Sequence, residues 1–257
     1  MSFNIPKVNR EEIIQTFKKH LINTVILRMD FADIFDSKDF ASKVVAKLAS
    51  DFPERGEETE EIFGQTEFAL IPIKKIVSYI LKNNKNKNYI KINQNSILIE
   101  CKTYENFNGL LQLFNEILSI YFSLYPNNNI LRIGLRKINF YDKEEKDQLI
   151  TFEEYFNDSL LPELNKKYLG TTLSQDIHSY IIKGENNEGF SINFRYGSSV
   201  FEEKEKKIRR FILDIDGYSF DDLSQKTLIE KFKKINDKIF DVFYFSIGDK
   251  IKGELKV

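Results

Sequence analysis

The hydrophobic and polar positions of this chain predict two successive runs of helices and strands in the same order. Apolar residues spaced three or four apart indicate amphipathic helices, and dense β-branched or alternating stretches indicate strands. Each run contains a strand, a helix, three strand-like stretches and a long helix, and one further helix precedes the first run. The first part of the chain is predicted as a helix at 10–22, a strand at 24–31, a helix from Asp36 to Pro53, an acidic irregular segment at 54–67, strand-like stretches at 73–81, 88–93 and 96–102, and a long helix at about 105–124.

The second run follows the same plan. A capping box of Thr151 and Glu154 predicts the start of its first helix. The run is predicted as a strand at 130–140, a helix at 152–164, strand-like stretches at 176–183, 189–196 and 207–216, and a long helix at about 221–245. Three-stranded meanders combined with helices predict an α+β fold, with antiparallel sheets packed with long helices.

Short sequence matches between the two runs suggest an internal duplication. LRMDF parallels LRKINF, which aligns Arg28 with Arg136, and ILIECKTYENF parallels FILDIDGYSF. Chance similarity between amphipathic segments is the alternative explanation. Under the duplication hypothesis the chain consists of two related α+β units, 1–126 (including the helix at 10–22) and 130–257.

The length, composition and charge of the chain exclude several classes of protein. With 257 residues, 42% hydrophobic and 14% aromatic, the chain can bury a sizeable core. A net charge of −1 argues against a protein held mainly by nucleic-acid phosphates. The single cysteine, Cys101, excludes an intramolecular disulfide and a cysteine-rich zinc site. The sequence has neither a signal-peptide pattern nor an apolar run of about 20 residues, so we expect a cytoplasmic protein without a membrane span.

The segment RIGLRKIN (132–139) is the most distinctive candidate for binding. Strand alternation sends Arg132, Gly134 and Arg136 to one face. A glycine inside a strand often marks the close approach of a ligand, and two flanking arginines can bind a phosphate or carboxylate in forked geometry. Alternatively, the arginines pair with carboxylates on neighbouring strands. The candidate ligand-binding residues are Arg28, Arg132, Arg136, Asn139 and Tyr218.

Carboxylates form a second candidate cluster. Asp214 and Asp216 share one face of a predicted strand, and Glu100 occupies the position that matches Asp214 in the first run. Carboxylates on adjacent strands can hold a divalent cation or act as acid and base. The simpler interpretation is that they face solvent or pair with the arginines.

The sequence contains no complete catalytic signature. His20 and His178 have no second ligand at metal-binding spacing. No serine lies in a nucleophile elbow, and no Walker loop or Rossmann fingerprint occurs. Aspartates recur every third residue from Asp30 to Asp39 but lack the pattern of a calcium-binding loop, so helix capping and solvation explain them. We therefore assign no catalytic residue and no cofactor, and we lean away from an enzyme.

Two basic stretches, KNNKNKNYIK (82–91) and KEKKIRR (204–210), are candidates for contact with single-stranded nucleic acid. Lysines can neutralise phosphates while tyrosines stack on bases. Solvation of a hairpin and protection of an edge strand is the simpler explanation for both.

The sequence resembles a sporadically distributed prokaryotic protein family whose activity is not established. Shared features are an early arginine-containing strand (27–31), an entry into a long helix marked by Tyr104 and Phe107, and a central R-I-G-L-R-aromatic-I-N segment (132–139). Lys137 replaces the family's usual aromatic residue, and Phe107 replaces its usual tryptophan. The patchy distribution of the family suggests accessory bacterial functions such as phage defence or toxin–antitoxin systems.

These observations favour a non-catalytic binding or regulatory protein that recognises a protein partner. The partner could be the product of a neighbouring gene, and a homo-oligomer is a further option. The alternative hypothesis is an enzyme or sensor that acts on an anionic, nucleotide-like ligand. In that hypothesis the candidate arginines bind the anion, and a divalent metal is held by Glu100, Asp214 and Asp216.

Overall fold

A computed structural model of the chain describes residues 5–32, 34, 36–65, 70–85, 87–144, 155–160, 175–183, 189–220 and 225–257. It confirms a mixed fold with a large antiparallel sheet, and the described residues form five helices. The chain divides into two compact units, each built from separate stretches of sequence. Among the described helices, none is long and apolar enough to cross a bilayer.

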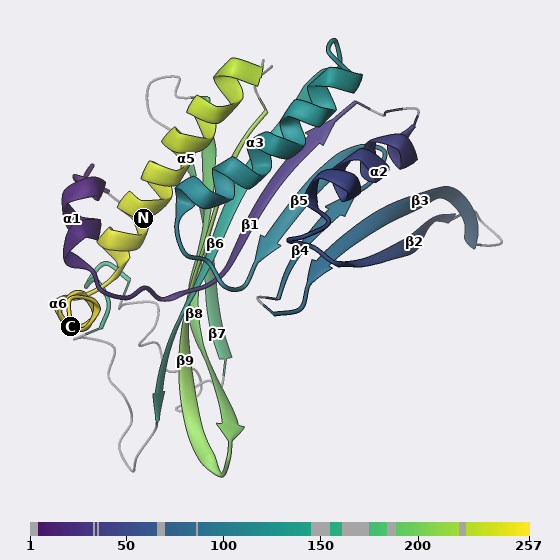
Figure 1. The fold of residues 1–257 in the computed structure, drawn as a ribbon. Helices are drawn as coiled ribbons and strands as arrows, with labels where there is room; N and C mark the ends of the chain where they lie inside the picture. Colours follow the sequence, from purple (N-terminus) through teal and green to yellow (C-terminus); the bar gives the residue numbers. More distant parts are fainter. Residues whose placement is uncertain are drawn as a thin grey trace. The chain divides into compact units, whose positions relative to one another are not determined.

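The first unit, here the β1–β5 unit, comprises Thr24–Gly134 and Ser219–Phe232. Its strands lie in the order β2-β3-β4-β5-β1, and each neighbouring pair is antiparallel (Figure 1). The elements are β1 (Ile22–Phe31), α2 (Ser37–Leu48), β2 (Glu54–Gln65), β3 (Leu70–Asn83), β4 (Asn88–Ile92), β5 (Ser96–Cys101) and α3 (Phe107–Leu124). The first residues of β6 (Ile130–Glu144) also belong to this unit.

The second unit, here the β6–β9 unit, comprises Met1–Asn23, Leu135–Tyr218 and Lys233–Val257. Its strands lie in the order β6-β9-β8-β7 (Figure 1). Its other elements are α1 (Arg10–Thr16), β7 (Gln175–Lys183), β8 (Ser191–Glu203), β9 (Lys206–Ser219), the larger part of α5 (Gln225–Ser246) and α6 (Asp249–Leu255). The strand β7 pairs with β8, and β8 pairs with β9, both antiparallel.

Side-chain caps fix the starts of two helices at the places that the sequence predicts. The carboxylate of Asp36 accepts a hydrogen bond from the backbone N–H of Asp39 at 2.8 Å, which starts α2. The amide oxygen of Asn106 accepts one from the backbone N–H of Gly109 at 2.8 Å, which starts α3. Such caps satisfy N–H groups that have no partner within the helix, so each helix begins at a defined residue.

Aromatic packing holds the core of the β1–β5 unit. The fully buried ring of Tyr121 in α3 lies 4.7 Å from the ring of Phe31 in β1 and 5.7 Å from that of Phe40 in α2, measured between centroids. The amide of Asn128 donates a hydrogen bond to the Tyr121 hydroxyl at 2.8 Å. One side chain thus joins a strand and two helices, and its single polar atom is satisfied within the core.

Contacts between α5 and β9 hold the core of the β6–β9 unit. A methyl group added at Gly217 in β9 would lie 2.4 Å from Cγ2 of Ile235 in α5 and 2.9 Å from Cδ1 of Ile192 in β8. Ile235 and Ile192 are themselves buried. The absence of a side chain at Gly217 therefore lets helix and strand approach closely.

Three predictions about local structure need correction. The acidic segment expected to be irregular at 54–67 contains the whole of β2, which pairs with β3 with one register shift between Ile62 and Phe63. The sequence does not predict this strand, because residues 54–62 are all exposed and therefore show no alternation of hydrophobic and polar residues. The helix expected at 10–22 ends at Thr16, where the chain turns so that the Lys18 N–H can donate to the Leu255 carbonyl at 2.8 Å.

The prediction of a helix at 152–164 is also wrong for the residues of this range that the structure describes. Residues 155–160 form turns and an isolated bridge between Phe156 and Ile247. The side chain of Asn157 accepts a hydrogen bond from the Ser159 N–H at 2.9 Å, a local bond that competes with helix formation. The capping box of Thr151 and Glu154 lies outside the described residues.

Candidate binding surface of the β6–β9 unit

Alternation along β6 separates two kinds of polar residue. Lys137 and Asn139 point to the buried side together with Ile133 and Leu135, whereas Arg136 is half-buried on the other side. The same alternation in β9 buries Leu213 and Ile215 on one side and places Asp214 and Asp216 on the other. The two carboxylates and Arg136 therefore share one face of the sheet.

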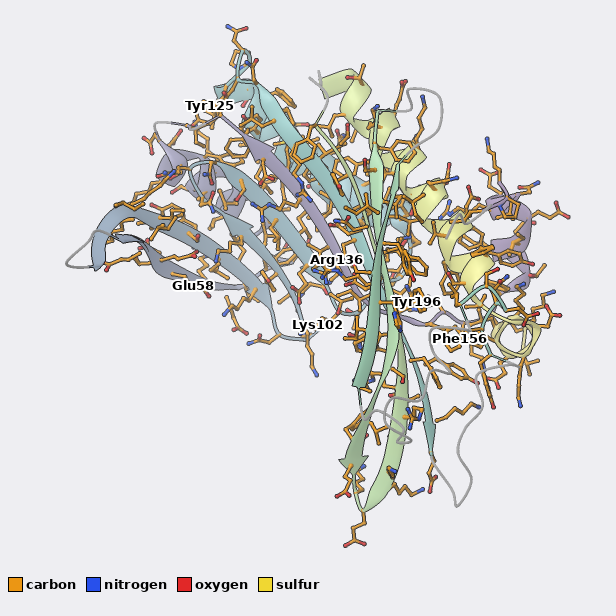
Figure 2. The ribbon with its side chains drawn as sticks, turned by 180° about the vertical axis from the view of Figure 1, so that it is seen from behind. Glu58, Lys102, Tyr125, Arg136, Phe156 and Tyr196 are labelled. Atoms are coloured by element: carbon orange, nitrogen blue, oxygen red, sulfur yellow. The ribbon has the colours of Figure 1, made fainter. Side chains whose placement is uncertain are left out.

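The guanidinium of Arg136, which is labelled in Figure 2, is bound by Asp214 in forked geometry. Its Nε donates to Oδ1 at 2.7 Å and its Nη2 to Oδ2 at 2.6 Å. The pKa of Arg136 is raised, mainly by this hydrogen bond and against the effect of partial burial. Of the two interpretations open at the sequence level, pairing with a neighbouring carboxylate describes this arginine.

Two residues that the sequence did not single out complete the cluster. Asn193 and Arg195 in β8 lie opposite Asp216 and Asp214 in the register of β8 and β9. Together with Arg136 they line a cavity of about 30 Å³, which has room for a water molecule. Arg195 is exposed, so it adds a positive charge at the surface beside two carboxylates. Strand alternation predicts that Asn193 and Arg195 share a face, but only the register places them beside the aspartates.

A charge-removal prediction follows from the Arg136–Asp214 pair. Only 11% of the Asp214 side chain and 35% of the Arg136 side chain are exposed. Replacing Asp214 by alanine should lower the free energy of unfolding by about 1–3 kcal/mol, because a partly buried charge then loses its hydrogen-bond partner. Urea unfolding checks this. The exposed pair of Lys43 and Asp39 is the control, since Lys43→Ala should cost about 0.5 kcal/mol or less; equal losses at the two sites would contradict the argument.

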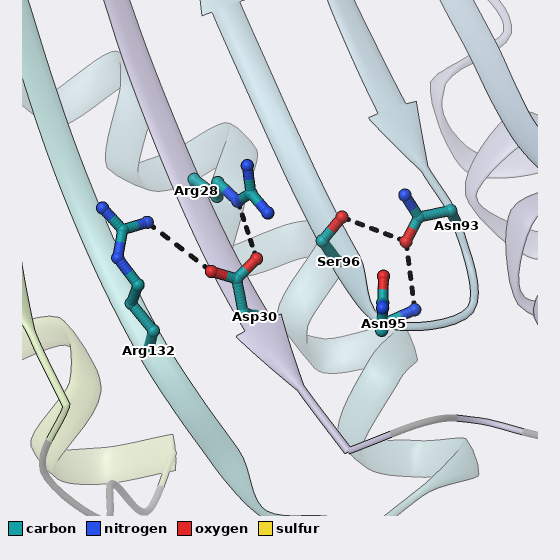
Figure 3. A network of polar contacts seen from close by, with 6 residues as sticks. All are labelled: Arg28, Asp30, Asn93, Asn95, Ser96 and Arg132. Atoms are coloured by element: carbon teal, nitrogen blue, oxygen red, sulfur yellow. Dashed lines mark hydrogen bonds and ion pairs between the residues drawn. The ribbon is translucent and has the colours of Figure 1, made fainter. Parts of the chain in front are cut away.

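The other two candidate arginines, Arg28 and Arg132, lie in the β1–β5 unit, where both contact the carboxylate of Asp30 (Figure 3). Arg28 Nε donates to Asp30 Oδ1 at 2.6 Å, and Arg132 Nη1 lies 3.5 Å from Asp30 Oδ2. The guanidinium of Arg132 also lies over Gly134, where an added methyl group would be 3.2 Å from Nη1. The gap left by the glycine is thus filled by the neighbouring arginine itself.

Three further candidate residues are Asn139, Tyr218 and Glu100. Asn139 is buried and donates to the Leu213 carbonyl at 3.1 Å, so it joins two strands. Tyr218 is half-buried near the end of β9. Glu100, in the β1–β5 unit, accepts a hydrogen bond from the Tyr89 hydroxyl at 3.0 Å and lies 3.7 Å from the Lys102 ammonium.

The described residues contain no candidate metal centre. Within the part of the chain that the structure describes, no three His, Cys, Asp or Glu side chains gather in a way that could hold a metal ion. Glu100, Asp214 and Asp216 do not form such a group. The aspartates from Asp30 to Asp39 serve arginine pairing and helix capping where they are described, and Asp33 lies outside the described residues.

Basic residues in both stretches form ion pairs with acidic residues elsewhere in the chain. In 82–91, Lys91 pairs with Glu58 at 3.2 Å. In 204–210, Lys206 pairs with Glu144 at 3.0 Å, and Arg210 binds Asp142 in forked geometry at 2.7 and 2.8 Å. These pairs reduce the positive charge that either stretch could offer to phosphates.

A buried lysine lies on the opposite side of β6. Lys137 Nζ donates to the side-chain oxygen of Asn236 in α5 at 2.7 Å. The pKa of Lys137 is lowered to about 7, mainly by burial and also by the nearby charge of Arg10, while Asp237 acts in the opposite direction. In a large fraction of the molecules the Lys137 side chain is therefore neutral near pH 7. A neutral amine is less costly to bury in a protein core than a charged one.

The strand at one end of the β6–β9 sheet leaves apolar side chains uncovered. β7 pairs with β8 on one side, and no other described strand pairs with it. Ile177 and Ile181 are 50% and 65% exposed, while the ring of Tyr180 stacks on that of Tyr196 with 5.8 Å between the ring centroids. One side of β7 is thus anchored in aromatic packing, and the other offers exposed isoleucines.

Comparison with known proteins adds no relative. No protein-family model matches the chain, and no curated protein matches it. The resemblance drawn from the central arginine segment therefore stays a prediction, and the surface has to be interpreted from its own geometry.

Proposed function

We propose that this protein is a non-catalytic binding protein that recognises a protein partner through β7 at the end of the β6–β9 sheet. The observation that carries the proposal is the exposure of Ile177 and Ile181 on an end strand. An extended segment of a partner can add to the outer side of an end strand by backbone hydrogen bonding. Exposed isoleucines at alternate positions would supply apolar contacts to the same segment.

The contrast between the two end strands supports this proposal. The end strand β2 has five glutamates between Glu54 and Glu61, all exposed, which is a common protection against unwanted pairing. The segment 177–182 of β7, with the sequence IHSYII, has no charge and no proline. An unprotected edge costs solubility unless it is covered, so the difference favours a role in binding.

The alternative of an anion sensor or metal-dependent enzyme has weaker support. Arg28 and Arg132 share the carboxylate of Asp30, and Arg136 is bound by Asp214. An anionic ligand would have to displace these carboxylates before it could bind the guanidinium groups. The accessory role in a bacterial phage-defence or toxin–antitoxin system rests on the resemblance alone, and we keep it as part of the proposal.

Affinity capture from cells of the source organism tests the proposal. The double variant Ile177→Ser/Ile181→Ser should lose a partner that the unchanged protein captures, because two exposed anchors are removed. The matched control is Ile73→Ser/Leu131→Ser, which removes side chains that are 63% and 52% exposed elsewhere. Equal capture by both variants, or capture of no protein by the unchanged chain, would count against recognition through β7.

We further infer that the chain arose by duplication of one unit in which a long helix packs on the sheet. The order β3-β4-β5-β1 matches the order β7-β8-β9-β6, because in each case the first strand of the run lies next to the last. Contacts of Tyr121 with β1 and of Ile235 with β9 support the helix packing. An experimental structure with β1 away from β5, or β6 away from β9, would contradict the duplication.

A further inference from the structure

We infer that the partner of β7 is a second copy of this chain, which pairs with β7 antiparallel about a two-fold axis at Ser179. The inference rests on the proposed function, since it names the occupant of the same end strand. Its basis is the symmetry of the strand: Ile177 and Ile181 lie at equal distances on either side of Ser179. All three are exposed and share one face of the strand.

Two-fold symmetry decides which residues can face each other. If two sheets join edge to edge about an axis perpendicular to the sheet, each residue lies opposite a residue on the same face of the partner strand. With the axis at Ser179, Ile177 lies opposite Ile181 of the second copy, and this contact occurs twice. On the other face, His178 lies opposite Tyr180 of the second copy, again twice. Apolar and aromatic cross-strand pairs are the favourable ones in antiparallel sheets.

The neighbouring registers are poorer. An axis at His178 would place Ile177 opposite Ser179, and an axis at Tyr180 would place Ile181 opposite Ser179. Either shift gives up both isoleucine pairs on the exposed face. The pattern of β7 therefore favours the axis at Ser179 over these two neighbouring registers.

The chemistry of the segment also suits a copy of itself. Residues 177–182 contain no Asp, Glu, Lys or Arg, and with the axis at Ser179 neither His178 faces its own copy, so pairing the segment with itself opposes no like charges. The rings of His178 and Tyr180 already lie against Tyr196, at 5.4 and 5.8 Å between centroids, and so hold the strand flat against β8. Pairing would require little reordering of the strand, which lowers its entropic cost.

Light scattering over a concentration series tests the inference. The unchanged protein should rise from the mass of one chain, 30.3 kDa, to twice that mass. Ser179→Lys should stay at the mass of one chain at every concentration, because the symmetry brings the two new ammonium groups together at the axis. The control Thr59→Lys adds the same charge to the exposed end strand β2 and should leave dimer formation unchanged.

Cross-linking tests the position of the axis directly. Directly opposite residues in an antiparallel pair have Cα atoms about 4.5–5.5 Å apart, within the range that a disulfide spans. Ser179→Cys should therefore form a covalent dimer under mild oxidation, and Thr59→Cys should not. Both variants retain the buried Cys101, so the Thr59 variant also controls for the native thiol.

Several outcomes would overturn the self-pairing. These are a protein that keeps the mass of one chain throughout, a dimer that persists in Ser179→Lys, or a Ser179→Cys dimer that does not cross-link. If self-pairing fails while capture of another protein still depends on Ile177 and Ile181, the proposed function stands and the occupant of β7 is a different protein. If capture fails as well, both are wrong.

Discussion

Replacing Gly217 by alanine is expected to lower the free energy of unfolding by about 1–3 kcal/mol, the usual cost of overpacking a core. The new methyl group would lie 2.4 Å from Cγ2 of Ile235, a distance that carbon atoms in proteins do not adopt. Either α5 must move away from β9 or Ile235 must change its side-chain conformation. Both responses disturb a core in which neighbouring side chains already fill the space.

Urea unfolding of Gly217→Ala and of Gly56→Ala measures this effect. Gly56 has no atom within 4 Å of the added methyl position, so its replacement should change stability little. A second substitution that removes Cγ2, Ile235→Ala, should cost less in the Gly217→Ala protein than in the unchanged protein, because the two changes act at one contact. Strict additivity of the two losses would contradict the close approach.

Removing the buried lysine together with its partner is expected to stabilise the protein at pH 7 by about 1–4 kcal/mol, the range found for buried ionic groups replaced by apolar ones. The double variant Lys137→Met/Asn236→Leu removes both ends of the 2.7 Å hydrogen bond, so neither polar atom is left without its partner. The side-chain nitrogen of Asn236 already has no hydrogen-bond partner among the described residues.

The pH dependence of this effect has a definite sign. In the folded protein the pKa of Lys137 is lowered to about 7, whereas an unfolded chain keeps a lysine near its usual value of about 10.4. Between these values the unfolded chain binds the additional proton, so raising the pH favours the folded state. The unchanged protein should therefore gain stability relative to the double variant, by about 1 kcal/mol per pH unit above pH 7.

Unfolding curves recorded at several pH values in this window check the prediction. Subtracting the profile of the double variant removes the contribution of every titrating group that the two proteins share. The single variant Asn236→Leu, which keeps the lysine, should retain the pH dependence of the unchanged protein. Parallel profiles for the unchanged protein and the double variant would show that Lys137 is charged in the core, contrary to its environment.

Elements with a clear pattern of burial were predictable from the sequence. The helices that begin after Asp36 and Asn106 have a capping side chain and a regular apolar face, and both appear where they were expected. β6 and β9 carry dense apolar residues and were also found at the expected places. Such patterns are local, because one face of each element must be buried.

Other features depend on pairing between distant segments. β2 was missed because its exposed glutamates give no alternation, and its existence rests on backbone pairing with β3. The sequence offered Asp214 as one of several partners for the arginines, but the choice of Arg136 and the addition of Arg195 depend on strand register. Register is set by the whole sheet, so the residues alone do not determine it.

The division of the chain has a practical consequence for work at the level of the gene. The two units meet at four places along the chain, and each lies inside a helix or strand. These are Asn23/Thr24 in β1, Gly134/Leu135 in β6, Tyr218/Ser219 in β9 and Phe232/Lys233 in α5. Each unit therefore draws on stretches that are far apart in the coding sequence. No contiguous fragment encodes either unit completely, so truncations made to isolate one of them would damage the other and would themselves be incomplete. Point substitutions in the intact chain are therefore the suitable way to study each unit.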